Sequence, residues 1–312
     1  MNALQMSREY VINTARPSLE RNFNELGTHL ASGLVGNGSE CFGFDDILSR
    51  DHDWGVDFYI WTLEDDRDHI PALNKWKNEL LESDPPEYPR SASEYGARIG
   101  CMTCGDFYRS LIGTPQCPQT LEEWIKAPEE QFAMAVNGEV FFDAAGEFSG
   151  TREELLRYYP EDIRLKRIAA KCMAVAQTGQ YNHDRTYKRG DFVTLRTVLS
   201  RFTDNAIALV FLLNKTYKPY YKWAFRALGD LPLLGRTTAD ALLQIAENGD
   251  FDGDAHEKRK VLIEELCKSF ADELTWQGLS DSNDYFLASH GESVQKKIKS
   301  GALSALPPQY EI

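Results

Sequence analysis

The chain has 312 residues, of which 42% are hydrophobic, 12% aromatic and 26% charged. This composition is that of a globular protein and excludes a fibrous, collagenous or wholly disordered chain. The 48 Asp and Glu residues against 34 Lys and Arg give a formal net charge of -14, which argues against non-specific binding to the phosphate backbone of nucleic acids.

The N-terminal segment MNALQMSREYVINTARPSLE lacks the apolar core of a secretory signal, so we expect a cytoplasmic protein. The longest apolar run, 206–213, is far shorter than the roughly 18 residues of a membrane span, and no membrane association is expected. The six cysteines are too few for a disulfide scaffold in a chain of this length. We expect them to be reduced.

Helices and strands are both expected in the first half of the chain. Apolar residues over 10–34 recur at steps of three and four, which predicts one or two amphipathic helices interrupted at Pro17. A glycine-rich stretch, 33–43, then precedes the aromatic run DWGVDFYIWTL, which has the composition of a strand. Two more strands are expected, over 97–103 and 131–142, the second containing an Asn-Gly pair typical of a hairpin turn.

Long helical periods replace this pattern in the second half. The expected helices are 152–178, 194–215, 220–228, 238–247 and 256–277. Strand patterns stop near 150–160, so we expect an α+β fold in two domains. Residues 1–155 are expected to form a mixed-sheet domain with helices, and residues 156–312 an all-α helical domain.

Asp51 and Asp53 form the most informative pair in the sequence. They stand two residues apart at the start of a predicted strand, so their carboxylates project from one face and could share a hard divalent cation such as Mg²⁺. The alternative is a solvated acidic turn. The nearby pair Asp45 and Asp46 is expected to be a helix cap or loop surface.

Gly38 and Ser39 lie upstream of this acidic pair, on a tight turn that leads into a predicted helix. Glycine lets a ligand approach the backbone closely, and the N–H groups and the serine hydroxyl can donate to phosphate oxygens. The two motifs together predict a site where metal and phosphate meet.

These residues resemble a known signature. Gly38-Ser39 followed by Asp51-x-Asp53 is similar to the GS…DxD motif of the DNA polymerase β-like nucleotidyltransferase superfamily. The segments GLVGNGSECFGFDDILSRDHDWG, GEVFFDAAGEF, LRYYPEDIRLKRIA, GQYN and LLNKTYKPYYKW resemble, more closely, the bacterial DUF4037 proteins. That resemblance runs from about Met6 to about Leu234.

The resemblance implies a Mg²⁺-dependent nucleotidyltransferase. Asp51 and Asp53 would be catalytic residues and the Mg²⁺ ligands, and Gly38 and Ser39 would bind the phosphates of the nucleotide. An NMP group, AMP from ATP in the expected case, would pass to a hydroxyl acceptor with release of pyrophosphate. Such transfer is catalysed mainly by positioning and charge neutralisation, which agrees with these residue types.

The resemblance also implies roles for the two domains. Residues 1–155 would form the nucleotidyltransferase-type domain, and residues 156–312 would help to bind substrate and nucleotide. A small-molecule acceptor is favoured, because the charge of -14 argues against an enzyme that modifies nucleic-acid ends.

Active members of the superfamily usually have a third carboxylate on a neighbouring strand. The segment 98–103 contains no Asp or Glu, and Asp57 stands too far along its strand to share the ion. Asp143 is the predicted catalytic substitute, with Asp106 as another, and a turn or cap role is the alternative for each. The missing acid keeps a second hypothesis open, a catalytically inactive nucleotide-binding or toxin-neutralising relative.

Lys222 is the predicted phosphate contact from the helical half, since related two-domain enzymes place a lysine of this domain on the triphosphate. Its alternative role is packing among the aromatic residues of TYKPYYKW, with the ammonium in water. Cationic clusters over 164–171 and 185–189 would either pair with phosphates or form solvated helix faces.

Overall fold

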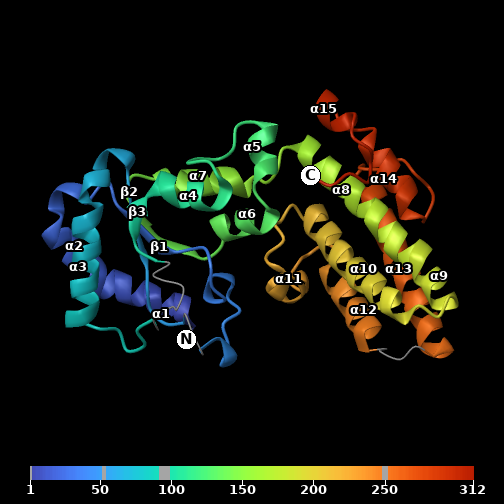
Figure 1. The fold of residues 1–312 in the computed structure, drawn as a ribbon. Coiled ribbons are helices and arrows are strands. Elements are labelled where there is room, and N and C mark those ends of the chain that lie inside the picture. The colour runs from blue at the N-terminus through green and yellow to red at the C-terminus, as the bar shows by residue number, and fades with distance from the viewer. Residues whose placement is uncertain (1, 51–53, 91–98, 248–251) are drawn as a thin grey trace. The chain divides into compact units, whose positions relative to one another are not determined.

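The chain divides into two units, Met1–Arg157 and Tyr158–Ile312, in a computed structural model (Figure 1). The structure describes residues 2–50, 54–90, 99–247 and 252–312. Four strands lie in unit 1, whereas the described part of unit 2 contains helices and loops. The chain is therefore a mixed α+β protein, and the division falls just beyond the expected boundary at 155.

The strands form a small mixed sheet in the order β3-β2-β1-β4. Strand β1 pairs antiparallel with β2 and with β4, while β2 and β3 run parallel. Their bounds are β1 Ala31–Leu34, β2 Tyr59–Thr62, β3 Cys101–Thr103 and β4 Glu139–Asp143.

Helical segments surround this sheet. The α-helices of unit 1 are α1 (Ala3–Tyr10), α2 (Arg16–Asn22), α3 (Ile70–Ser83), α4 (Cys104–Ile112), α5 (Leu121–Lys126), α6 (Glu129–Val136) and α7 (Glu147–Leu156). A π-helical turn, η1 (Val11–Ala15), joins α1 to α2, and short 3₁₀ turns occur at η2 (Asn24–Leu26), η3 (Glu40–Phe42), η4 (Leu48–Arg50) and η5 (Glu64–His69).

Pro17 stands in the first turn of α2 and does not end the helical run. Proline has no N–H to donate to the carbonyl four residues earlier, and the preceding turn widens into η1 instead of breaking. The predicted interruption is thus a change of helix type within a continuous run.

The strand and hairpin predicted over 131–142 are wrong in their first half. Residues up to Val136 belong to α6, and the Asn137-Gly138 pair makes the turn from α6 to β4. Phe132, Ala133 and Ala135 are buried on this helix. A short apolar run of this kind fits a buried helix as well as a strand, because its periodicity does not separate the two.

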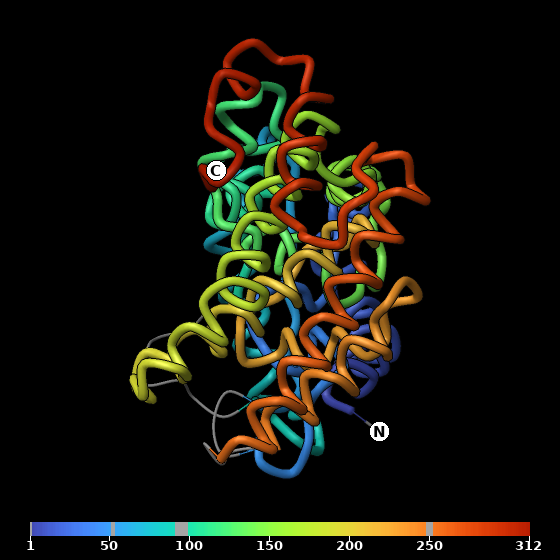
Figure 2. Tube along the Cα trace, turned by 90° about the vertical axis from the view of Figure 1, so that its right-hand side faces the viewer, coloured from blue at the N-terminus to red at the C-terminus, as the bar shows by residue number. Residues whose placement is uncertain are grey.

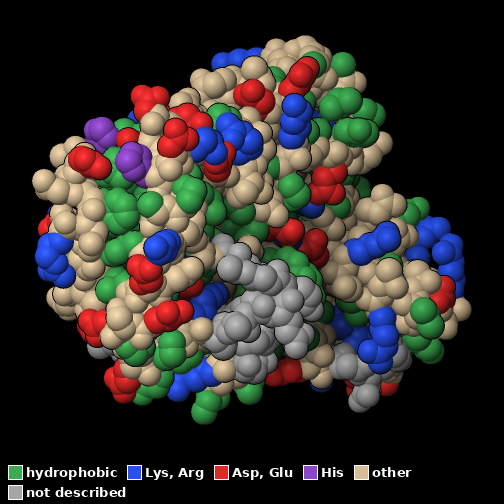
Figure 3. Space-filling view, turned by 60° about the vertical axis from the view of Figure 1, so that its left-hand side comes forward, with side chains coloured by type: hydrophobic (Ala, Val, Ile, Leu, Met, Phe, Trp, Pro, Cys, Tyr) green, Lys and Arg blue, Asp and Glu red, His purple; other side chains and the backbone are tan. Residues whose placement is uncertain are grey.

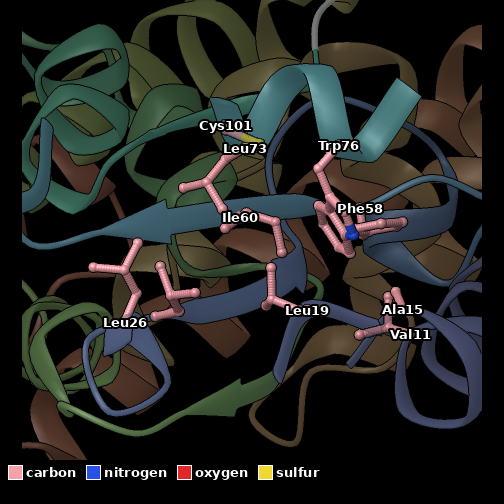
Figure 4. Close-up of a cluster of buried hydrophobic side chains, with 10 residues drawn as sticks. Val11, Ala15, Leu19, Leu26, Phe58, Ile60, Leu73, Trp76 and Cys101 are labelled. Carbon is pink, nitrogen blue, oxygen red and sulfur yellow. The ribbon is translucent and has the colours of Figure 1, made fainter. Parts of the chain in front are cut away.

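Strand β2 packs one face of the sheet against helices. Phe58, just before β2, and Ile60 are buried in a hydrophobic cluster with residues of the N-terminal helical run, α3 and β3 (Figure 4). The other members are Val11, Ala15, Leu19, Leu26, Leu30, Leu73, Trp76 and Cys101. Burial of this layer contributes favourably to the stability of unit 1.

The opposite face of β2 carries aromatic residues. The Trp61 ring stacks on Phe148 of α7 with ring centroids 3.7 Å apart, and it meets Phe107 of α4 at 5.4 Å. Tyr59 also contacts Phe107, at 5.4 Å. Because helices cover both faces of β2, its sequence is apolar at consecutive positions rather than alternating with polar residues.

Unit 2 is built from helices, of which α8 packs alongside α10 and α14 (Figure 2). Their bounds are α8 (Glu161–Val175), the π-helical η6 (Ala176–Asn182), α9 (His183–Lys188), α10 (Phe192–Leu213), α11 (Tyr221–Leu228), α12 (Gly235–Glu247), α13 (Gly253–Trp276), α14 (Leu287–Gln295) and α15 (Gly301–Ser304). A search of the described residues found no helix with the length and apolar character needed to cross a membrane.

Buried cations of α8 tie distant parts of unit 2 together. Arg164 is 2% exposed and donates through Nε to the carbonyl of Leu212 at 2.9 Å. Lys166 is fully buried and donates through Nζ to the carbonyls of Pro307 and Pro308, at 2.8 and 3.0 Å. Burial lowers the pKa of Lys166 to about 8. These two cations of the 164–171 cluster are neither solvated nor open to phosphate.

Trp61→Ala tests the aromatic face of β2. The substitution removes a fully buried ring stacked on Phe148, so we expect it to lower the free energy of unfolding of unit 1 by about 3–5 kcal/mol. Urea denaturation followed by circular dichroism measures the change. Leu48→Ala is the control, because Leu48 is 79% exposed and its loss should cost less than about 0.5 kcal/mol. Equal effects of the two substitutions on the free energy of unfolding would contradict the buried position of Trp61 against Phe148.

We expect His183 to make unit 2 sensitive to acid. Its ring stacks on His256 at 4.7 Å, and burial, with smaller contributions from the charges of His256 and Arg259, lowers its pKa to about 4. Between pH 6.5 and 4 the unfolded chain therefore binds a proton that the folded chain does not. The free energy of unfolding should fall over this window, by on the order of 3 kcal/mol from this group.

His183→Phe removes the titrating group and keeps a ring against His256. Urea titrations at a series of pH values should show a shallower loss of stability below pH 6.5 in this variant than in the wild type. Parallel pH profiles for the two proteins would rule out His183 as the source of the acid sensitivity.

Candidate functional site

The loop predicted to bind phosphate, residues 35–43 and called the phosphate loop below, leaves the end of β1. Three of its glycines, Gly36, Gly38 and Gly43, have φ angles of 109°, 132° and 70°, which residues with a side chain rarely adopt. Within the described residues, no group accepts a hydrogen bond from the N–H of Gly38 or Ser39. Among the described residues, these two donors are thus without an acceptor.

The turn between α6 and β4 holds this loop in place. The Asn137 side chain accepts from the N–H of Gly36 at 2.7 Å and donates to its carbonyl at 2.8 Å. The N–H of Gly138 donates to the carbonyl of Cys41 at 2.7 Å. A Cβ on Gly138 would lie 2.0 Å from the Leu34 carbonyl oxygen, so no other residue fits there. Asn137 and Gly138 are thus hydrogen-bonded to the loop near both of its ends, at Gly36 and at Cys41.

A buried carboxylate lies directly behind Gly38. Glu40 is 1% exposed, and a Cβ on Gly38 would lie 2.5 Å from its two carboxylate oxygens. The Arg90 guanidinium donates to Glu40 at 2.7 Å, and the two side chains are 12% and 2% exposed. Burial lowers the pKa of Arg90 and the Glu40 carboxylate raises it, with a net rise. Glu40 therefore has a charged partner inside the protein.

The backbone of Arg90 also reaches the segment that leads into β2. Its N–H donates to the carbonyl of Val56 at 3.3 Å, and the N–H of Val56 donates to the carbonyl of Tyr88 at 2.7 Å. A Cβ on Gly55, whose φ is 129°, would lie 2.7 Å from the Pro89 carbonyl oxygen. The segment 88–90 thus lies against residues 55 and 56.

Asp51 and Asp53 lie outside the described residues, so their assignment stays a prediction. The register of the sheet bears on the chain that follows them. Strand β2 begins at Tyr59, opposite Gly33 near the end of β1. The chain after Asp53 therefore enters the sheet at the edge where the phosphate loop leaves it.

Asp45 is half-buried, and its carboxylate satisfies a backbone donor at the start of α1, which agrees with the cap role expected for it. Its carboxylate accepts hydrogen bonds from Trp54 Nε1 at 3.1 Å and from the N–H of Ala3 at 3.0 Å. Asp46 is exposed and accepts from the N–H groups of Leu48 and Ser49, at 2.9 and 3.1 Å. Asp46 therefore has the loop role that was expected, while Asp45 anchors the chain on either side of the site.

Asp143 caps a helix in the structure. Its carboxylate accepts from the N–H groups of Gly146 and Ser149, at 2.9 and 2.7 Å, where α7 begins. It pairs with Ala31 at the start of β1, whereas Leu34 at the other end carries the phosphate loop. The separation along the strand is roughly 10 Å. This position favours the cap alternative, and a catalytic role for Asp143 stays a prediction.

The other carboxylates considered as a third acid also have partners. Asp106 accepts from Arg67 and from Arg109, each at 2.6 Å. Asp57 pairs with the buried Lys77 at 2.7 Å. Both carboxylates thus have cationic partners and structural roles in unit 1.

Sequence reasoning missed two carboxylates at the loop edge of the sheet. One is Glu40, and the other is Glu139, which begins β4 opposite Leu34 and pairs with Arg8 at 3.1 Å. The Glu139 side chain is 38% exposed. The register of β4 was needed to locate Glu139, and the partner of Glu40 stands fifty positions further along the chain.

Lys222 lies in unit 2, exposed on α11, with Nζ 5.0 Å from the ring centre of Trp223. This contact is the aromatic packing expected as its alternative role, and a contact with phosphate stays a prediction. In the second cationic cluster, Arg185 lies over Tyr181 at 4.7 Å and Lys188 pairs with Asp184 at 2.5 Å. On the face shown in Figure 3, acidic and basic side chains lie interspersed over much of the surface.

Within the described residues, no three side chains of His, Cys, Asp or Glu are grouped so as to hold a metal ion. The predicted Mg²⁺ ligands are outside those residues, so this finding does not bear on them. The six cysteines are buried and free.

The chain matches no curated protein and no solved structure. Residues 124–224 match the family described as a domain of unknown function, DUF4037. The match runs from within α5, through α8 and α10, into α11. The phosphate loop and the acidic pair precede it in the sequence. The similarity to the DUF4037 family thus extends over residues 124–224, which is less than half of the chain.

Proposed function

We propose that this protein is a Mg²⁺-dependent nucleotidyltransferase that moves AMP from ATP to a hydroxyl of a small molecule, with release of pyrophosphate. The observation that carries the proposal is the phosphate loop. It combines left-handed glycines with N–H donors at Gly38 and Ser39 that have no acceptor in the described chain. Such a loop suits the close approach of an anion to backbone N–H groups.

The acidic pair supplies the second half of the argument. The carboxylate oxygens of Asp51 and Asp53 are the ligands that Mg²⁺ prefers, and Mg²⁺ would neutralise charge on the phosphate oxygens. Gly38 and Ser39 would hold the phosphates while the acceptor hydroxyl attacks the α-phosphorus. A new P–O bond forms, the bond to the bridging oxygen breaks, and its electron pair leaves with pyrophosphate. Lys222 is proposed to contact the triphosphate.

One observation favours a second candidate, a nucleotide-binding or toxin-neutralising protein without turnover. Asp143 and Asp106, the substitutes for the missing third carboxylate, are both engaged elsewhere in unit 1. For the first candidate, the proposed base for the acceptor proton is then Glu139, at the loop edge of the sheet. Measured pyrophosphate release separates the two candidates.

Asp51→Ala and Asp53→Ala should each abolish Mg²⁺-dependent binding of ATP, because either change removes a ligand of the proposed ion. Isothermal titration calorimetry with Mg²⁺–ATP measures this. Asp68→Ala, an exposed acidic residue on η5, is the control and should bind as the wild type does. Wild-type affinity in both Asp51 and Asp53 variants would refute the metal site.

Asp143→Asn separates the two roles of that residue. As a cap, Asp143 loses one of two acceptor oxygens, so the free energy of unfolding should fall by about 1 kcal/mol while pyrophosphate release continues. Glu139→Asn is the comparison, and it should reduce pyrophosphate release if Glu139 takes the acceptor proton. Loss of release in Asp143→Asn with unchanged ATP binding would instead restore Asp143 as the third catalytic carboxylate.

A further inference from the structure

We propose that Arg90 is a positioning residue of the phosphate loop, neutralising Glu40 so that the loop can accept an anion. The inference rests on the proposed nucleotide site. It concerns a residue that lies outside the GS…DxD signature and fifty positions from its partner in the sequence.

The argument begins with a conflict of charge. Glu40 follows the proposed phosphate donors directly in the sequence, and its carboxylate oxygens lie 2.5 Å from the position that a Cβ on Gly38 would take. An unpaired carboxylate at this depth would repel each phosphate brought to the loop, since the attraction or repulsion between charges grows as water is excluded. Water cannot screen the charge of the Glu40 carboxylate, because the residue is only 1% exposed.

Arg90 resolves this conflict. Its guanidinium contacts the Glu40 carboxylate at 2.7 Å, and the two side chains are only 12% and 2% exposed. The positive charge of Arg90 therefore neutralises the negative charge of Glu40 directly behind the phosphate loop. Buried ion pairs contribute little to stability on balance, and an apolar pair of similar volume would often do as well. The position of the pair behind Gly38 therefore points to a role in the loop's electrostatics.

The same residue also sets the spacing of the site. Through its backbone N–H, Arg90 is bonded to Val56, three positions after Asp53. One residue thus joins the phosphate loop, by its side chain, to the segment that follows the proposed metal ligands, by its backbone.

A double-mutant cycle tests the proposal. Arg90→Met leaves Glu40 charged and unpaired, and binding of Mg²⁺–ATP should weaken by roughly 30-fold or more. Glu40→Gln removes the repulsive charge and should bind ATP at least as tightly as the wild type. The double variant Glu40→Gln with Arg90→Met should recover most of the lost affinity, and Arg90→Lys should recover part of it. Thermal melts of all four variants establish that each is folded.

The charge of the ligand provides a readout that a purely structural role would not move. In Arg90→Met, the loss of affinity should be largest for ATP and inorganic tripolyphosphate and smallest for AMP, because the repulsion scales with phosphate charge. A uniform loss for all three, or a double variant no better than Arg90→Met, would overturn the inference and show that the pair only supports the fold.

The outcomes also distinguish this inference from the proposed function. If the wild type binds ATP or tripolyphosphate and the cycle behaves as expected, the inference stands even when no pyrophosphate is released. If the wild type binds and Arg90→Met binds equally well, the inference alone is wrong. Wild-type protein that binds neither ligand would overturn both proposals, since no anion then uses the loop.

Discussion

The structure of unit 1 depends on covering both faces of β2. Ile60 faces the cluster built on the N-terminal helical run and α3, and Trp61 faces the stack with Phe148. A strand in this position has no solvent side, so helices from four separate parts of the sequence must reach it. That requirement draws α2, α3, α4 and α7 around one short sheet and brings β1 alongside β2.

The phosphate loop is held in place by this arrangement. It follows β1 in the chain, and the α6–β4 turn is hydrogen-bonded to it through Asn137 and Gly138. Behind it, Glu40 and Arg90 occupy the space that an apolar core would otherwise fill. A preformed loop of this kind would lose little conformational freedom on binding an anion.

The sequence predicted the α+β class and the run containing β2, because Tyr59, Ile60 and Trp61 give a strong local signal for a strand. The prediction was wrong over 131–136, which form a helix packed against α4. A short apolar run does not distinguish a buried helix from a strand. Asp143 looked available because a helix cap depends on backbone geometry at Gly146 and Ser149. Glu40 with Arg90 was out of reach, since the pairing of residues so distant in sequence arises only from tertiary structure.

The boundaries of the family match do not coincide with the units of the fold. Residues 124–224 begin within α5 of unit 1 and end within α11 of unit 2. Cut out alone, this stretch would leave Phe148 without Trp61, and Lys166 without the proline carbonyls that accept its hydrogen bonds. The extent of the family match and the extent of a unit that folds by itself are therefore different. Expression of the matched stretch by itself should yield an aggregating or protease-sensitive fragment, and trimming for biochemical work should respect the division after Arg157.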